Sequence, residues 1–265
     1  INSRFPNNGT NNSAFNTFVQ GELADSIAKK FHFFPGCPKE LVEFSNLTKD
    51  SQLIWLEENE PNWEIVLVGN HFIDDGDPTP CIVSEIAQGH PRIHAVTQIK
   101  KGMMGWDMKS GLQAATGKSL AVIDGDGQMP SSDVIRVYQL MKTNGLDLAK
   151  TYRAKRNDSS YRRLISVGYN ILFKLLFPGI NAWDMNSKPK IMTREFYEKM
   201  NLESNGWFID AEIMIFARRL HARIGEVQTV FLSMDSRPSF VKPFSILEFL
   251  GNLFWYRVKE IFAKK

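Results

Sequence analysis

Short apolar runs alternate with segments of helical periodicity along most of the chain, and this alternation limits the possible folds more than any other feature. Candidate strands lie at residues 31–34, 64–68, 92–98, 120–123 and 146–150, and candidate helices at 39–58, 105–116 and 132–142. Alternation of this kind indicates parallel strands joined by crossover helices. The sequence therefore predicts an α/β fold with a mostly parallel central sheet between layers of helices.

The composition is that of an ordinary soluble globular protein. Of the 265 residues, 43% are hydrophobic and 23% are charged, and a net charge of +3 does not suggest a nucleic-acid partner. Polar, Asn-rich sequence at the start predicts a flexible arm over residues 1–25. We expect one α/β domain over 26–240 and an amphipathic helix over 241–265.

The cysteines and the apolar segments bear on the compartment. Cys37 and Cys81 form neither a disulfide framework nor a zinc-type cluster, which favours a reducing cytosol. The first residues lack the basic-then-apolar pattern of a signal peptide. The sequence contains no run of about eighteen apolar residues, so it predicts no membrane-spanning helix. We therefore expect a cytoplasmic protein.

The segment AVIDGDGQMP, residues 121–130, places three polar side chains after an apolar strand. Asp124, Asp126 and Gln128 are spaced two apart, so in extended backbone their side chains point the same way. Ligands of open α/β sheets bind at the carboxyl ends of strands. Carboxylate and amide oxygens suit Mg²⁺ or Mn²⁺ and leave positions open for phosphate oxygens. A solvated Asp-Gly turn is the alternative for this segment alone.

Further motifs follow in a fixed order up to residue 242. They are Arg153 in LAKTYRAKR, Arg162 and Ser166 in YRRLISVGYN, Asp184 in AWDMNSKPKIMTRE, Asp210 and Glu212 in GWFIDAEIMIFARR, and Arg237 and Lys242 in DSRPSFVK. With residues 124–130, they resemble the GT-A glycosyltransferases that include dolichyl-phosphate mannose synthase and bacterial polyprenyl-phosphate glucosyltransferases. The agreement in order and spacing covers about half of the chain, from 101 to 242.

This resemblance implies a fold and a reaction. The fold is a Rossmann-like GT-A sandwich that binds a nucleotide sugar, over residues 26–240. The reaction is metal-dependent transfer of a sugar from a UDP- or GDP-sugar to a polyprenyl phosphate, and a single displacement would invert the anomeric carbon. The implied cofactor is Mg²⁺ or Mn²⁺.

The donor site has expected residues in two groups. A divalent ion on Asp126 and Gln128 would neutralise the charge that develops on the leaving diphosphate, while Asp124 would hold the ion's waters or the nucleotide. Arg237 and Lys242 would clamp the diphosphate or the acceptor phosphate, because a guanidinium matches phosphate in a two-point fork. The alternative for these two is a solvated basic loop.

The role of the remaining residues depends on the acceptor. A lipid phosphate is already anionic, so Arg153, Arg162 and Ser166 would position it without proton transfer. A sugar hydroxyl would need a general base, for which Asp210 is the candidate. Asp210 is also explained as a first-turn acid that the helix dipole stabilises.

The first third of the chain departs from the family pattern. Of the family's Pro-x-Tyr-Asn-Glu segment only Pro35 and Glu40 are retained, and we expect both at the donor site. The family's acidic pair after the second strand corresponds to VGNHFIDDGD, residues 68–77. Either an insertion has moved that pair outward, or Asn70 and His71 have replaced it. The nucleobase of the donor stays open for this reason.

Two apolar segments with basic residues indicate a lipid partner. They are YRRLISVGYNILFKLLF, residues 161–177, and FSILEFLGNLFWYRVKEIFAKK, residues 244–265. Aromatic, leucine and basic residues at helical spacing are typical of helices that lie in a membrane surface. Packing against the sheet is the alternative. We expect a peripheral location on the cytoplasmic face of a membrane.

Two other function classes are compatible with the sequence. One is a GT-A transferase that uses a sugar hydroxyl in polysaccharide or glycan synthesis, with the same metal site. The other is a non-catalytic relative that acts as a binding module, which the altered first third would permit. The retained Asp126, Gln128, Arg153, Arg162 and Arg237 favour an enzyme.

Overall fold

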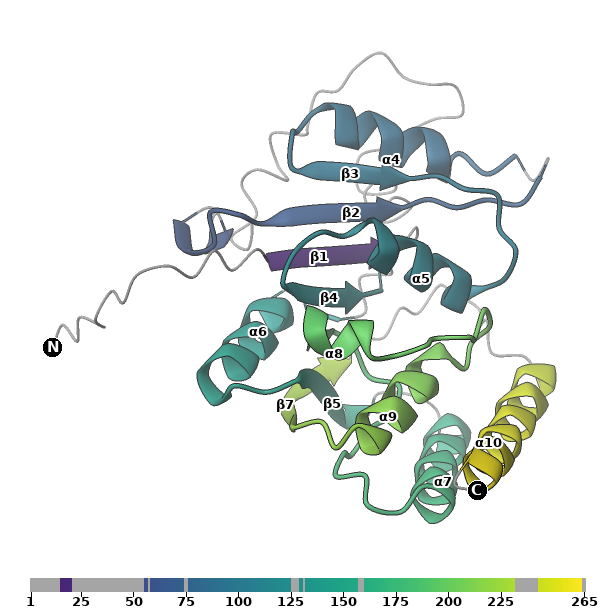
Figure 1. Cartoon of the computed structure of the whole chain (residues 1–265). Helices are drawn as coiled ribbons and strands as arrows, with labels where there is room; N and C mark the ends of the chain where they lie inside the picture. Colours follow the sequence, from purple (N-terminus) through teal and green to yellow (C-terminus); the bar gives the residue numbers. More distant parts are fainter. Residues whose placement is uncertain are drawn as a thin grey trace, which may run out of the picture.

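The protein forms a single sheet with helices on both faces (Figure 1). The computed structural model describes residues 15–20, 55–56, 58–73, 76–124, 129–130, 132–156, 160–231 and 243–263. Within these residues the sheet has seven strands in the order β3-β2-β1-β4-β6-β5-β7. The expected α/β class is confirmed.

The strands and helices have the following bounds. The strands are β1 (Phe15–Gln20), β2 (Glu64–Val68), β3 (Ile93–Val96), β4 (Ser119–Ile123), β5 (Leu148–Arg156), β6 (Lys190–Thr193) and β7 (Ile224–Phe231). The helices are α4 (Thr79–Gln88), α5 (Met104–Ala114), α6 (Ser132–Asn144), α7 (Ser160–Leu176), α8 (Arg194–Glu198), α9 (Ile209–Arg219) and α10 (Pro243–Ala263).

One strand runs against the others. β6 is antiparallel to both of its neighbours, β4 and β5, whereas the remaining strand pairs are parallel. In its register, Lys190 lies opposite Val122 of β4 and Lys150 of β5. The start of β6 therefore lies beside the carboxyl end of β4. β5 continues beyond this point to Arg156.

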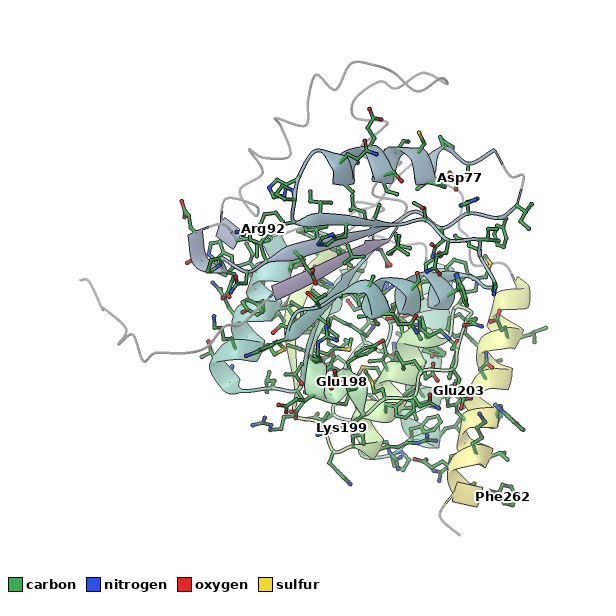
Figure 2. All side chains as sticks on the ribbon, turned by 45° about the horizontal axis from the view of Figure 1, so that its top comes forward. Asp77, Arg92, Glu198, Lys199, Glu203 and Phe262 are labelled. Atoms are coloured by element: carbon green, nitrogen blue, oxygen red, sulfur yellow. The ribbon has the colours of Figure 1, made fainter. Side chains whose placement is uncertain are left out.

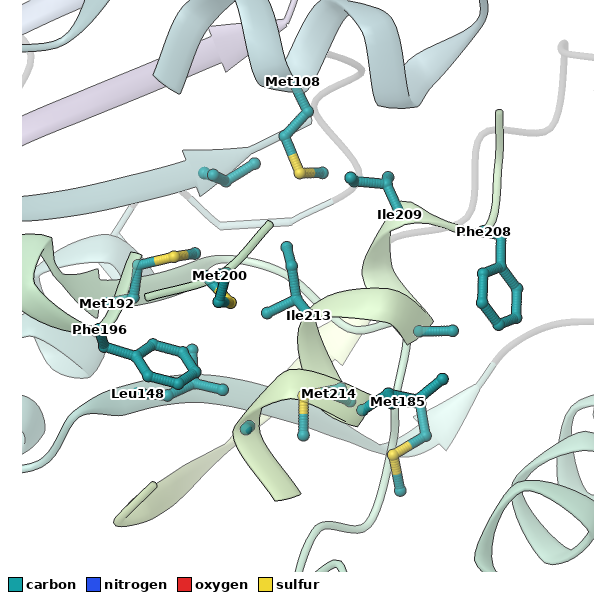
Figure 3. Close-up of a cluster of buried hydrophobic side chains, with 14 of the residues drawn as sticks. Met108, Leu148, Met185, Met192, Phe196, Met200, Phe208, Ile209, Ile213 and Met214 are labelled. Atoms are coloured by element: carbon teal, nitrogen blue, oxygen red, sulfur yellow. The ribbon is translucent and has the colours of Figure 1, made fainter. Parts of the chain in front are cut away.

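Alternate residues of the central strands contribute to two hydrophobic cores. Leu120 and Val122 of β4 belong to a core that includes residues of α5, α7, α9 and α10, part of which Figure 3 shows. Ala121 and Ile123 belong to a second core with residues of α4 and α6. Every residue of β4 is buried. A strand covered on both faces needs such a continuous apolar run, which is why the sequence pattern identified it.

Most of the expected elements in the described residues are present. The strand at 64–68 has the predicted bounds, and the strand at 120–123 begins one residue earlier, at Ser119. The strand expected at 92–98 is shorter, and the one expected at 146–150 begins at Leu148 and continues to Arg156. The strand expected at 31–34 and most of the helix expected at 39–58 lie outside the described residues.

The expectation of a flexible arm over residues 1–25 is wrong for residues 15–20. These residues form β1, which lies between β2 and β4. Phe18 lies opposite Val66 on one side and Val122 on the other. The partners are distant in the sequence, so the local Asn-rich composition gave no indication of this pairing.

The C-terminal helix is present as α10, which lies beside α7 (Figure 1). Aromatic contacts join the two, with the rings of Tyr169 and Phe249 5.6 Å apart in an edge-to-face arrangement. Among the helices of the described residues, none has the length and apolar character needed to cross a bilayer.

Candidate functional site

Asp124 directly follows β4, at the carboxyl end of that strand. Its side chain is 29% exposed, and its Oδ1 atom accepts a hydrogen bond from the ammonium group of Lys188 at 2.5 Å. The location agrees with the expected ligand-binding edge of the sheet. Asp126 and Gln128, the other two expected metal ligands, lie outside the described residues and stay predictions.

The reversed strand β6 brings two lysines to this edge. Lys190 is the first residue of β6, and Lys188 precedes it by two positions. Both side chains are almost completely buried, with 1% of Lys188 and none of Lys190 exposed. Lysines are rarely buried without a partner. Their partners are the carboxylates of the site.

Asp210 lies in the first turn of α9 and contacts both lysines. Its Oδ1 atom lies 2.5 Å from the Lys190 ammonium, and its Oδ2 atom lies 3.4 Å from the Lys188 ammonium. Burial by itself would raise the pKa of Asp210, but the two ammonium groups hold the pKa below its ordinary value. Asp210 is therefore a buried, ionised carboxylate whose two oxygens both face cations.

The two lysines differ in their proton affinity. Burial opposes the charge of both, but the carboxylates of Asp124 and Asp210 raise the pKa of Lys188 above its ordinary value. For Lys190, burial outweighs the attraction of Asp210, and the nearby charges of Lys150 and Lys188 oppose a further charge, so its pKa falls to about 8. Of these two lysines, Lys188 therefore holds its proton more tightly.

A second group of ion pairs fixes the chain that leads into β6. Nε and one terminal nitrogen of the Arg153 guanidinium donate to Asp184 Oδ2 and Oδ1 at 2.6 and 2.9 Å. The Lys150 ammonium donates to the backbone carbonyl of Asp184 and pairs with Glu226 of β7 at 2.9 Å. Arg153 and Asp184, which belong to two of the motifs that carry the resemblance, are therefore direct partners. A two-point fork between them holds both groups in one orientation.

Helix α7 borders the same loop. Asn170 accepts a hydrogen bond from the backbone N–H of Met185 at 3.2 Å and donates to the carbonyl of Ser166 at 2.9 Å. Ser166 is therefore one helical turn from a residue that contacts the 184–187 loop. Arg162 lies in the first half of α7, and its side chain is not among those described.

Tyr169 is a residue of this site that the sequence analysis missed. Its hydroxyl is buried and has no hydrogen-bond partner among the described residues. Burial raises its pKa, and the nearby carboxylates of Asp210 and Asp184 raise it further. The signal in the sequence was its spacing of three residues from Ser166, which places both on one side of α7.

Glu212 has a structural role. Its carboxylate accepts hydrogen bonds from the backbone N–H groups of Glu203 and Ser204 at 2.8 and 2.9 Å. It also accepts from the hydroxyl of Tyr256 in α10 at 2.5 Å. The Asp-x-Glu motif thus opens α9 as expected, with its two acids directed to different partners.

The end of β2 shows how the altered first third is arranged. Asn70 is buried, donates to Asp107 and Ser110 at 2.9 Å each, and accepts from the backbone N–H of Gln98 at 2.7 Å. These contacts tie the end of β2 to α5 and to the segment after β3. The acidic pair at 74–75 lies outside the described residues, so both interpretations of this segment stay open.

Of the three expected ligands of the cation, only Asp124 lies within the described residues. Asp124 supplies the hard oxygen ligand that Mg²⁺ or Mn²⁺ prefers, and its place at the rim fits such an ion. No group of three or more His, Cys, Asp or Glu side chains that could hold a metal occurs among the described residues. Of the residues expected at the donor site, Pro35, Glu40, Arg237 and Lys242 lie outside them.

Comparison with known proteins decides the family. Residues 51–220 match the family described as Glycosyl transferase family 2. The chain belongs to this family. The matched region contains Asp124, Arg153, Asp184, Lys188 and Asp210, and the resemblance expected from the motifs is confirmed.

Curated relatives have names that specify lipid-linked acceptors. A dolichyl-phosphate beta-glucosyltransferase of Trichomonas vaginalis is 27% identical over 75% of this chain and 62% of its own length. One of Dictyostelium discoideum is 27% identical over 69% of this chain and 59% of its own length. An undecaprenyl-phosphate 4-deoxy-4-formamido-L-arabinose transferase of Pectobacterium atrosepticum is 30% identical over 42% of this chain and 33% of its own. The chain thus spans about six-tenths of the two dolichyl-phosphate relatives.

Solved structures of glucosyl-3-phosphoglycerate synthase from Mycobacterium tuberculosis have the same fold. The complex with uridine diphosphate has a TM-score of 0.59 at 14% identity, covering 92% of this chain and 80% of the other. The complex with Mn²⁺, uridine diphosphate and phosphoglyceric acid has a TM-score of 0.58 at 14% identity, covering 95% and 78%. The expected GT-A-like fold is confirmed.

Proposed function

We propose that this chain transfers a sugar from a nucleotide diphosphate sugar to a polyprenyl phosphate at the carboxyl end of β4, with inversion of the anomeric carbon. Membership of Glycosyl transferase family 2 supports the reaction type. Relatives named for dolichyl phosphate and undecaprenyl phosphate support the acceptor. Displacement of the diphosphate from the opposite face of the sugar accounts for the inversion.

The state of Asp210 is the observation that favours an anionic acceptor. Both of its oxygens face lysine ammonium groups, and its pKa lies below the ordinary value. A general base works best with a pKa near the working pH and a free oxygen toward the substrate. Asp210 meets neither condition in this arrangement. A phosphate acceptor is already ionised and needs no such base, so Arg153, Arg162 and Ser166 would act by positioning it.

The donor side of the site uses oxygen ligands and basic groups. Asp124, Asp126 and Gln128 would hold Mg²⁺ or Mn²⁺, which when bound neutralises negative charge on the departing diphosphate. Structural neighbours crystallised with uridine diphosphate and Mn²⁺ or Mg²⁺ support a UDP-sugar and a divalent cation, with a GDP-sugar as the other candidate. Arg237 and Lys242 would bind phosphate, and Pro35 and Glu40 would border the nucleotide.

A transfer assay tests the proposal. The chain is incubated with radiolabelled UDP- and GDP-sugars, Mn²⁺ or Mg²⁺, and either undecaprenyl or dolichyl phosphate. We expect label in the lipid fraction with at least one donor, and loss of that label when the cation is chelated. Label only in a free oligosaccharide acceptor would instead indicate a glycan-extending transferase. The absence of donor binding under all conditions would indicate a binding module.

Exposed apolar side chains on α7 support binding to a membrane surface. Val167, Ile171 and Leu175 are 49%, 55% and 73% exposed, and their spacing of four residues places them in one stripe along the helix. Trp183, just beyond this helix, is 72% exposed and has the Lys174 ammonium over its ring. Apolar and aromatic residues with adjacent lysines are typical of interfacial helices.

Helix α10 has a similar exposed stripe. Among the described side chains of this helix, the large apolar ones that are more than four-tenths exposed are Leu247, Phe254, Trp255, Val258, Ile261 and Phe262. Figure 2 shows Phe262 at the end of the helix, pointing away from the sheet. Its opposite side is buried through Leu253 and Tyr256. The expected alternatives of core packing and membrane contact therefore both have support, on opposite sides of one helix. We propose a peripheral location on the cytoplasmic face of a membrane.

Replacing Leu175 and Phe254 together with aspartate is expected to weaken vesicle binding by about tenfold or more, because each change removes apolar area from the lipid contact. The measurement is co-sedimentation with vesicles of phosphatidylcholine and a minor share of phosphatidylglycerol. Ile73→Asp is the control, since Ile73 is 69% exposed but follows β2. Equal binding by all three proteins would contradict the membrane contact through α7 and α10.

A further inference from the structure

The Lys188 ammonium lies among three groups from different parts of the chain. Its distances are 2.5 Å to Asp124 Oδ1, 3.3 Å to the sulfur of Met104 and 3.4 Å to Asp210 Oδ2. Only 1% of the side chain is exposed, whereas 29% of the Asp124 side chain is. The ammonium therefore approaches Asp124 from the protein interior, and the carboxylate faces the rim of the sheet.

The charges of this cluster are balanced among the described residues. Arg153 pairs with Asp184, Lys150 with Glu226, and Lys190 with Asp210. Lys188 pairs with Asp124 and also contacts Asp210. Four cations thus face four carboxylates. A divalent ion that used Asp124 as a ligand would add positive charge beside these eight described side chains, whose charges already balance.

We propose that Lys188 competes with the divalent cation for Asp124 and so weakens binding of that cation to the free protein. The inference rests on the proposed function, because that function requires the cation. A cation that used Asp124 as a ligand would bind the same carboxylate as the ammonium. Oδ1 already has the ammonium at 2.5 Å. A cation and an ammonium on the same carboxylate repel each other, and burial reduces the screening of that repulsion.

The position of Lys188 keeps its ammonium group beside Asp124. The side chain is enclosed by Met104 and Asp210, so the ammonium cannot turn into solvent without losing its contacts with both. The negative charge of a donor diphosphate would restore the balance when it arrives with the metal. Lys188 thereby favours joint binding of the cation and the donor over binding of the cation alone.

The test measures Mn²⁺ affinity directly, by the paramagnetic resonance signal of free Mn²⁺ during titration of the whole chain without donor. Lys188→Gln removes the charge and keeps a hydrogen-bond donor, and we expect about tenfold tighter Mn²⁺ binding. Lys150→Gln is the matched control, because Lys150 is equally buried but pairs with Glu226. We expect the control to change the affinity by less than about threefold. Equal affinities of wild type and Lys188→Gln would overturn the proposal.

A second variant decides the question if Lys188→Gln does not fold. Lys188→Met removes the same charge and keeps an unbranched side chain that can pack against Met104, so we again expect about tenfold tighter Mn²⁺ binding. An unchanged Mn²⁺ affinity in a folded Lys188→Met protein would overturn the proposal.

The transfer assay separates this inference from the proposed function. If lipid glycosylation requires Mn²⁺ but the affinities do not change as expected, the competition is wrong and the function stands. If neither wild type nor Lys188→Gln binds Mn²⁺ and no sugar is transferred, both are wrong.

Discussion

Replacing Asp126 with alanine is expected to lower the rate of sugar transfer by about 1000-fold. Asp126 is two residues beyond Asp124, which the structure places at the end of β4. Its carboxylate would hold the cation that neutralises the charge developing on the leaving diphosphate. The measurement is the initial rate of label transfer to lipid phosphate at saturating donor and Mn²⁺.

The fold of the Asp126→Ala variant is expected to be intact, because the proposed role of this carboxylate is to hold the cation. The control is Glu198→Ala in α8. The side chain of Glu198 is 62% exposed, and Glu198 is the last residue of α8. It is not one of the site residues. We expect a normal rate from this control. A near-normal rate in Asp126→Ala would remove the metal role of that residue and with it the donor site proposed at β4.

The sequence predicted the central strands because their signal is local. Residues 65–68 and 120–123 are continuous apolar or β-branched runs, as a strand covered on both faces requires. β1 is also central, but its polar neighbours hid it, and its place depends on pairing with strands far along the chain. The register of such pairing is not a property of a short segment.

The lysines of the site were missed for a related reason. Lysine is usually a surface residue, so Lys188 and Lys190 gave no local indication of burial. They are buried because β6 is inserted antiparallel between β4 and β5, which carries its first residues to the carboxylates of Asp124 and Asp210. The alternation Lys188-Pro189-Lys190 before the apolar residues Ile191 and Met192 was the available signal.

Asp210 is a case in which the sequence left two roles open and the structure adds a third. The candidates were a general base and a first-turn acid of the helix that the motif opens. It does lie in the first turn of α9, but its nearest charged partners are Lys190 and Lys188. Those partners come from a segment 20 residues earlier, which no local pattern around Asp210 could indicate.

Replacing Asp210 with asparagine is expected to lower the free energy of unfolding by about 3–5 kcal/mol, because it leaves buried lysine charge without its carboxylate. Asparagine keeps the size of the side chain, so the loss reports charge. The measurement is urea denaturation at neutral pH. Asp147→Asn is the matched control, since Asp147 pairs with Arg223 at 3.3 Å while their side chains are 33% and 66% exposed. We expect about 1 kcal/mol or less from this exposed pair.

The pH dependence of the stability difference between wild type and Asp210→Asn tests whether this difference arises from charge. Folding lowers the pKa of Asp210 from its ordinary 3.8, since the lysines outweigh the effect of burial. A lowered carboxyl pKa contributes stability that is complete above the ordinary value and is lost as the pH falls through the lowered one. The stability gap between wild type and Asp210→Asn should therefore shrink in strong acid, where Asp210 is protonated in both the folded and the unfolded protein. It should also widen as the pH falls below 8, because the variant lacks the carboxylate that raises the pKa of Lys190, and protonating this buried lysine then costs more. A variant of full stability would contradict the assignment of this stability to the buried ion pairs.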